Sequence, residues 1–183
     1  LSSFLSPAVN DRADGYGGEQ LEDRARFPLE VIDVVRAAMP EGMPLFLRVS
    51  ATDWFFEGGQ TVEDSVRFAR LAKEHGVDVI DVSSAGNVPT SRPVYGRMYQ
   101  VPFAERIRYE AELPVMAVGA IQGIDHANTI LVSGRADLCA MARPHLEDPH
   151  LTLALAAGQI AALAAGHATP DGAPSKPPSH STP

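Results

Sequence analysis

Four stretches of the sequence decide its fold: PLFLRVS (residues 44–50), VDVIDVS (77–83), PVMAVG (114–119) and ADLCAMA (136–142). Each is a short, mostly apolar run that is bounded by Gly, Pro or polar residues. Runs of this kind are typical of strands that are buried on both faces. We therefore predict four buried strands.

Helical patterns alternate with these strands. They are expected over residues 19–39, 61–75, 102–111, 125–134 and 148–166. Pro28 should kink the first helix or restart it, because proline lacks a backbone donor. Thr61 and Asp64 have the spacing of a capping box, and Gly76 follows as a C-terminal stop. Asp125 is expected to cap the fourth helix.

The alternation predicts an α/β fold with a parallel sheet that is covered by helices on both faces. Periodicity leaves two architectures open, a doubly wound sheet and part of a (β/α)8 barrel, of which four strands would form one half. No Gly-x-Gly-x-x-Gly motif opens a helix after a strand, which weighs against a dinucleotide-binding sheet. In either architecture the functional residues should lie at the carboxyl ends of the strands.

The composition narrows the function classes. The 183-residue chain has a formal net charge of −8, which argues against a nucleic-acid partner. Its single cysteine, Cys139, allows no intramolecular disulfide and no cysteine-pair metal site, and we expect a buried, inert thiol. No apolar run is long enough to span a membrane and no signal peptide is visible, so we expect a cytoplasmic protein without a membrane partner.

Arg48 lies inside the first apolar strand, where an unpaired guanidinium would be costly. It can face a ligand as a cation, or it can form an internal salt bridge with Asp81 or Asp53. The sequence leaves both interpretations open.

Small residues and one arginine end the last two strands. Gly119 and Ala120 follow the third strand, and Ala142 and Arg143 end the fourth. Small residues let backbone N–H groups approach an anion, and barrels often hold a phosphate after the last two strands. The alternative is that the small residues only allow close helix packing and that Arg143 lies on the surface.

The loop over residues 83–100 is long for such a connection, which is frequent where a loop faces a substrate. A solvated loop is the alternative. Its arginines and tyrosines are Arg92, Tyr95, Arg97 and Tyr99. His145 and His150, near the fourth strand, are more simply surface or capping residues than catalysts.

A series of motifs follows in a fixed order: SFLSP (3–7), NDR (10–12), DGYGG (14–18), LEDRARF (21–27), LRVS (47–50), VIDVSS (79–84), VPFA (101–104), AVG (117–119) and GRADL (134–138). From Leu1 to about Leu151, this series resembles the part of Old Yellow Enzyme (NADH:flavin oxidoreductase) relatives that follows the fourth barrel strand. The resemblance implies the C-terminal half, strands 5–8, of a (β/α)8 TIM barrel. It also implies an enzyme that holds FMN, is reduced by NADPH or NADH, and passes hydride to an activated alkene or a related small-molecule acceptor.

Site residues follow from the resemblance by position. Arg48 resembles the arginine beside the flavin N1 and C2 carbonyl, and Gly119 lies in the turn that meets the FMN phosphate. Ala142 and Arg143 resemble the phosphate-binding pair, whose first place is usually glycine. The polar pair that binds the acceptor and the tyrosine proton donor of the family precede this segment, so no catalytic residue is assigned.

The resemblance further implies that the chain is a fragment. The first residue of the sequence, Leu1 rather than Met, agrees with this expectation. Residues 1–167 would form the C-terminal half-barrel, inactive alone, and the missing N-terminal half would be its partner. The Pro- and Ser-rich tail over residues 168–183 is expected to be disordered. Because this tail lacks the arginine-bearing stretch of some dimeric relatives, homo-oligomerisation stays open.

Three alternatives are kept. The segments over residues 92–100 and 139–146 resemble the barrel domain of fusions that act on aminobenzoyl-CoA or salicylyl-CoA, in which Arg92 and Arg97 would contact CoA phosphates. A non-catalytic half-barrel is the second alternative, and its exposed sheet edges predict pairing or aggregation. A phosphate-binding barrel without flavin is the third.

Overall fold

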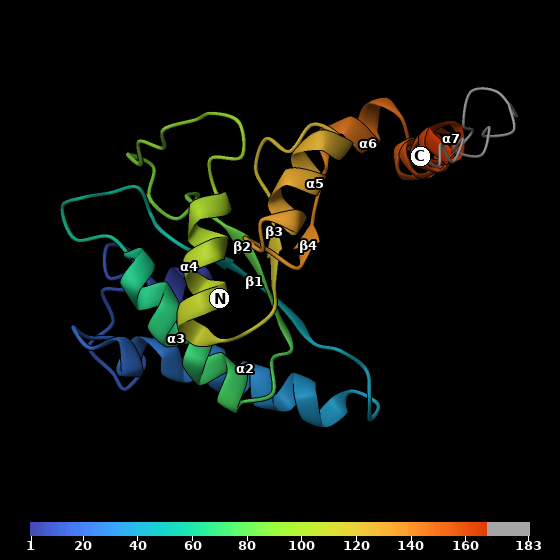
Figure 1. Ribbon diagram of the computed structural model, residues 1–183. Helices are drawn as coiled ribbons and strands as arrows, with labels where there is room; N and C mark the ends of the chain where they lie inside the picture. Colours follow the sequence, from blue (N-terminus) through green and yellow to red (C-terminus); the bar gives the residue numbers. More distant parts are fainter. Residues whose placement is uncertain (168–183) are drawn as a thin grey trace, which may run out of the picture. The chain divides into compact units, whose positions relative to one another are not determined.

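The computed structural model describes residues 1–167, which fall into two units, Leu1–Arg143 and a second that begins at Pro144. The predicted disordered tail lies outside the described residues. The elements of the first unit are α1 (Ser2–Leu5), α2 (Leu21–Ala38), β1 (Phe46–Ser50), α3 (Val62–Glu74), β2 (Val79–Ser83), α4 (Val101–Ala111), β3 (Val115–Ala117), α5 (Ile124–Val132) and β4 (Leu138–Cys139) (Figure 1). The short α6 (Arg143–Glu147) crosses the boundary, and α7 (Leu151–His167) belongs to the second unit.

The predicted parallel α/β sheet is confirmed. Its four strands are all parallel and lie in the order β1-β2-β3-β4, which is their order in the chain. An order without reversal is typical of barrel winding, whereas a doubly wound sheet reverses at a switch point. The strands are shorter than predicted, down to two residues in β4, because the flanking residues leave the ladder for the loops.

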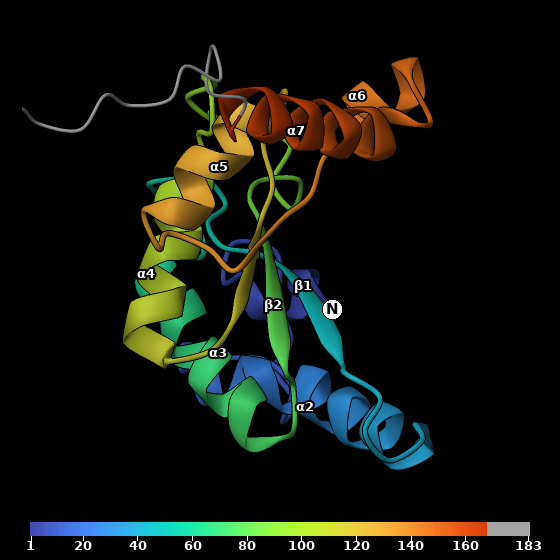
Figure 2. The same cartoon turned by 45° about the vertical axis from the view of Figure 1, so that its right-hand side comes forward.

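The expectation that helices cover both faces of the sheet is wrong for the described part of the first unit. Val49, Val82 and Ala117 share one face and are buried. Helix α4 contacts β2 and β3 and runs beside α3 (Figures 1 and 2). On the opposite face Phe46 is 43% exposed and Leu138 is 42% exposed. The reason is that right-handed crossovers between strands added in one direction place every helix on the same side.

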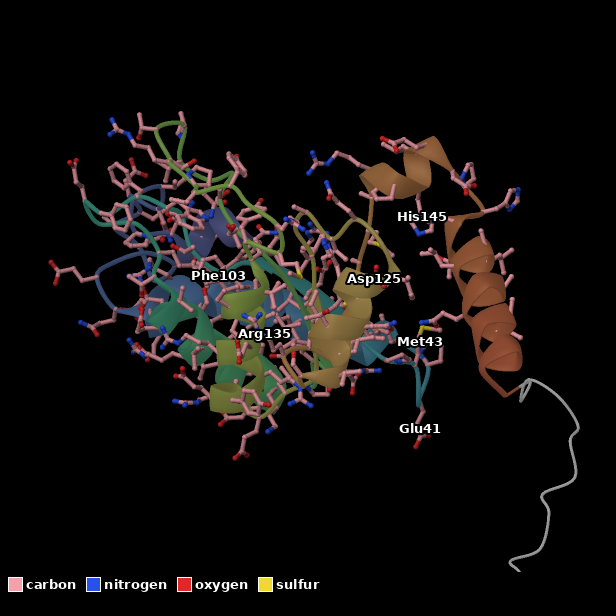
Figure 3. The ribbon with its side chains drawn as sticks, turned by 45° about the horizontal axis from the view of Figure 1, so that its top comes forward. Glu41, Met43, Phe103, Asp125, Arg135 and His145 are labelled. Atoms are coloured by element: carbon pink, nitrogen blue, oxygen red, sulfur yellow. The ribbon has the colours of Figure 1, made fainter. Side chains whose placement is uncertain are left out.

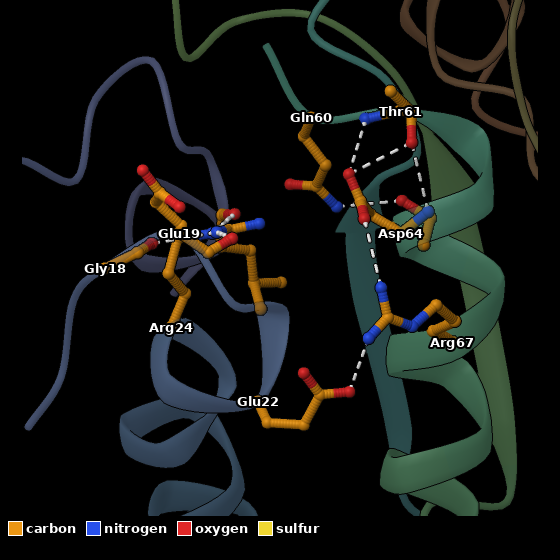
Figure 4. Close-up of polar contacts among 10 residues, drawn as sticks. Gly18, Glu19, Glu22, Arg24, Gln60, Thr61, Asp64 and Arg67 are labelled. Atoms are coloured by element: carbon orange, nitrogen blue, oxygen red, sulfur yellow. Dashed lines mark hydrogen bonds and ion pairs between the residues drawn. The ribbon is translucent and has the colours of Figure 1, made fainter. Parts of the chain in front are cut away.

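The predicted end of α3 and its capping box are confirmed. Asp64 N donates to Thr61 Oγ1 at 3.1 Å, and Thr61 N donates back to Asp64 Oδ2 at 3.2 Å (Figure 4). Gly76, with φ +87°, follows the C-cap residue His75 and ends the helix.

Two other expectations about helices change. The cap of α5 is Gly123, not Asp125, because the helix already begins at Ile124 and leaves Asp125 in its first turn (Figure 3). In the first turn, the Asp125 carboxylate still interacts favourably with the positive end of the helix dipole. Pro28 does not restart a helix, since α2 is one helix that contains it.

Arg24 on α2 holds the N-terminal loop in place. Its side chain is 3% exposed and donates to three backbone carbonyls, those of Leu5 at 2.8 Å, Gly18 at 2.9 Å and Glu19 at 2.6 Å (Figure 4). A buried guanidinium is tolerated when acceptors surround it in this way. None of the helices described is long and apolar enough to cross a membrane.

Candidate functional site

Strained backbone gathers where the strands end. Three non-glycine residues with left-handed backbone follow successive strands: Trp54 (φ 53°) after β1, Ala85 (φ 64°) after β2 and Ala120 (φ 51°) after β3. Met98 (φ 56°) lies in the loop before α4. Such conformations cost free energy and persist where the surroundings enforce them, often at functional sites. The carboxyl edge of the sheet is therefore the candidate site, as predicted.

Arg48 lies in a row that crosses the open face of the sheet. The strand register places it opposite Asp81, and Asp81 opposite Met116. Arg48 Nη1 and Asp81 Oδ2 are 3.0 Å apart, which selects Asp81 and not Asp53 as the salt-bridge partner. The expectation that the guanidinium is buried is wrong, since its side chain is 57% exposed on the uncovered face.

Asp81 is more enclosed than its partner. Its side chain is 15% exposed, and its Oδ1 is buried without a hydrogen-bond partner among the described residues. Burial raises the pKa of this carboxyl, and the Arg48 charge opposes the shift. Desolvation of the Asp81 carboxylate thus outweighs its stabilisation by Arg48.

Asp81→Asn should change how stability depends on pH. Because the pKa of Asp81 is raised in the folded state, the folded protein binds this proton more tightly than the unfolded chain, whose carboxyl titrates at about 3.9. The carboxylate thus lowers stability as pH rises from the unfolded pKa through the folded one. We expect the free energy of unfolding of the variant, relative to the unmodified chain, to increase in urea titrations as pH rises above the unfolded pKa of about 3.9. A difference that stays constant as pH rises would contradict the assignment.

Gly119 begins the turn after β3 in a conformation that requires glycine. Its φ is +113°, and a Cβ at this position would come within 2.5 Å of Gln100 Nε2. Its neighbour Ala120 continues the turn in the left-handed region. Glycine is therefore required at position 119, where the buried Gln100 side chain lies against the turn.

Ala142 and Arg143 reach the same edge of the sheet. Ala117 and Cys139 are register partners, and Ala140 N extends the ladder by donating to Ala117 O at 2.8 Å. Residues 119 and 142 thus follow paired positions of neighbouring strands. Both Ala142 and Arg143 are exposed. Burial raises the pKa of Tyr99, Tyr95 adds to the shift and Arg143 opposes it, so this cation acts on the loop before α4.

Other predicted candidates are placed less centrally. Arg92, Tyr95 and Arg97 are exposed in the loop before α4, and the Tyr95 and Tyr99 rings meet edge to face at 5.3 Å. Cys139 is half-buried rather than fully buried as predicted, and burial raises the pKa of its thiol. His150 is exposed, and His145 Nε2 lies 3.2 Å from Thr152 Oγ1.

From the sequence, Asp53 was considered only as a salt-bridge partner of Arg48, and Gln100 was not singled out, yet both are buried at this edge. Asp53 is fully buried and accepts hydrogen bonds from Ser6, Gln60 and Asn87. Gln100 is 3% exposed beneath the turn at Gly119. In the sequence, each is only a polar residue that follows an apolar run or precedes a helix. Many solvent-exposed residues have the same place, so the pattern does not indicate burial.

Comparison with known proteins gives a consistent match. A family model described as the NADH:flavin oxidoreductase / NADH oxidase family matches residues 1–161. The NADPH dehydrogenase of Geobacillus sp. (strain WCH70) is 49% identical over 156 residues, which cover 85% of this chain and 44% of that relative. The NADPH dehydrogenase of Bacillus subtilis (strain 168) is 45% identical over 149 residues, 81% of this chain and 43% of the relative. The chain thus spans less than half the length of these curated relatives.

Solved structures agree with the sequence matches. Histamine dehydrogenase from Rhizobium sp. 4-9 superposes with a TM-score of 0.71 and 28% identity, over 87% of this chain and 23% of that one. Morphinone reductase superposes with a TM-score of 0.62 and 26% identity, over 85% of this chain and 40% of that one.

Proposed function

Because the chain belongs to the NADH:flavin oxidoreductase / NADH oxidase family, we propose that it supplies the C-terminal half, strands five to eight, of an FMN-binding (β/α)8 barrel. The complete protein would oxidise NADPH or NADH and reduce an activated alkene or a related small acceptor. When bound, FMN supplies the hydride transfer, which no amino-acid side chain performs. The residues of this chain bind and orient that group.

The open face of the sheet supports a half-barrel. In a closed barrel, alternate strand residues point inward and pack in layers. Phe46, Arg48 and Leu138 have this inward position, yet each is more than two-fifths exposed. Strands one to four of the barrel, contributed by a preceding half, are the partner that would cover them.

Arg48 carries the proposal. Within residues 1–161, its guanidinium makes one hydrogen bond, from Nη1 to Asp81, so Nε and Nη2 remain available as donors. A planar pair of N–H donors matches neighbouring ring acceptors such as the flavin N1 and C2 carbonyl. A fixed cation there stabilises the negative charge that reduction places on the ring.

The phosphate end of FMN fits the edge formed by Gly119, Ala142 and Arg143. The absence of a Cβ lets Gly119 adopt the positive φ that shapes this turn beside Gln100, and the exposed Arg143 adds a fork of donors. Alanine at position 142, where relatives usually have glycine, narrows the approach by one methyl group. Its exposed position leaves room for this methyl group.

A hybrid protein tests the proposal. The part of the Geobacillus sp. NADPH dehydrogenase that precedes the matched region is joined to Leu1, a junction that the 49% identity makes feasible. We expect this hybrid to bind one FMN and to lose flavin absorbance when NADPH is added without oxygen. The 183-residue chain alone should bind FMN far more weakly.

The matched control is Arg106→Ala in the hybrid. Arg106 lies on α4 and pairs with Glu63 and Glu110 on the outer surface, so its loss should leave flavin binding unchanged. A hybrid that folds by circular dichroism but binds no FMN would rule out the proposed function.

A further inference from the structure

We propose that Gln100 is a positioning residue that fixes the turn after β3 to receive the phosphate of FMN, an inference that rests on the proposed function. Gln100 precedes α4 as its N-cap residue, and its side chain is almost fully buried at 3% exposure. A buried side-chain amide is costly unless its hydrogen bonds are made. Its two partners therefore define its place in the fold.

The amide group of Gln100 connects three strand ends. Its Nε2 donates to Val118 O at 3.0 Å, just after β3, and its Oε1 accepts from Ser84 Oγ at 2.7 Å, just after β2. Ser84 Oγ in turn accepts from Trp54 Nε1 at 2.9 Å, in the loop after β1. The Trp54 ring packs edge to face on Phe103 of α4, with 5.5 Å between the ring centroids, which holds the indole in place.

The turn that Gln100 holds presents unused donors. Gly119 and Ala120 have φ values of +113° and 51°, and successive backbone N–H groups in a turn can form a concave site that binds anions. Among the hydrogen bonds of the described residues, none is donated by the backbone N–H groups of Gly119, Ala120 or Ile121. The anchored carbonyl of Val118 fixes the chain immediately before these donors.

The Gln100 side chain packs closely against the backbone of Gly119. A Cβ on Gly119 would lie 2.5 Å from Nε2 and 3.1 Å from Cδ of Gln100. Movement of this side chain would therefore free the turn to relax. We infer that Gln100 acts on the phosphate through the backbone and makes no contact with the flavin ring.

The first test is the selectivity of the hybrid for FMN over riboflavin, which lacks the phosphate. Gln100→Met keeps the length of the side chain but removes both hydrogen bonds. We expect the Kd for FMN to rise roughly tenfold, the size of one lost charge-assisted hydrogen bond. The Kd for riboflavin should change less than about twofold, within the scatter of a neutral substitution.

Gln60→Met is the matched control. Gln60 is a second buried glutamine, 2% exposed, that bonds Ser65 away from this turn, so its loss should leave FMN selectivity unchanged. Ser84→Ala is a smaller change that removes one anchor of Gln100 and should give an intermediate loss. Equal weakening of FMN and riboflavin, or none, would overturn the inference.

The second test needs no flavin. In the 183-residue chain itself, Gln100→Met should change the backbone NMR chemical shifts of residues 118–121 more than those elsewhere, because Val118 O loses the hydrogen bond from Gln100 Nε2. Unchanged chemical shifts over these residues would show that Gln100 does not hold the turn. A wild-type hybrid that binds neither flavin would instead overturn the proposed function, and the phosphate role with it.

Discussion

Replacing Arg48 with alanine in the hybrid is expected to slow reduction of the bound FMN by NADPH about 100-fold, the usual loss when one preorganised charge-stabilising donor is removed. Arg48 pairs with Asp81 on the open face of the sheet. Alanine at position 48 would remove the cation and leave the Asp81 carboxylate unpaired, which opposes the negative charge of the reduced flavin. The measurement is the loss of flavin absorbance in anaerobic rapid mixing, together with the Kd of FMN. Both should worsen.

Two variants separate charge from geometry. Arg48→Lys keeps the cation but loses the planar fork of donors, so it should recover part of the reduction rate. Asp81→Asn leaves Arg48 without its counter-charge and should raise the reduction potential of the flavin, since a bare cation favours the reduced, anionic ring. Unchanged affinity together with an unchanged reduction rate in Arg48→Ala would refute the role of this residue.

Asp53→Ala is expected to destabilise the chain by about 3 kcal/mol, because several buried donors would lose their acceptor at once. Asp53 is fully buried, and its Oδ2 accepts from Ser6 Oγ at 2.6 Å and from Gln60 N at 2.7 Å. Its Oδ1 accepts from Asn87 Nδ2 at 2.8 Å. The carboxylate thus joins the N-terminal segment to the loops after β1 and β2. Urea unfolding followed by circular dichroism measures the change.

Asp11→Ala is the matched control, since Asp11 is exposed and should change stability by less than about 0.5 kcal/mol. Asp53→Asn should lie between the two, because it keeps one acceptor oxygen but turns an N–H₂ group towards Asn87. Equal stability of Asp53→Ala and Asp11→Ala would show that the network does not support the fold.

Local patterns were sufficient for much of the fold. The capping box of Thr61 and Asp64 and the stop at Gly76 depend on residues three or four positions apart, so the sequence shows them directly. The alternation of apolar runs and helical patterns likewise predicted a parallel sheet, which is present. The cap of α5 was misplaced because Gly123 and Asp125 are both acceptable N-cap residues, so residue type alone does not decide between them.

The sequence by itself determined the class of the fold and the order of its elements, and it predicted the carboxyl edge as the place for function. Only the tertiary structure decided which side chains meet there. Asp53 accepts a hydrogen bond from Ser6, which is 47 residues away in the sequence, and Arg48 pairs with Asp81, which is 33 residues away. Parallel neighbours are joined through a helix, so their register depends on how that helix packs, and no local rule fixes which residues of the two strands lie opposite each other.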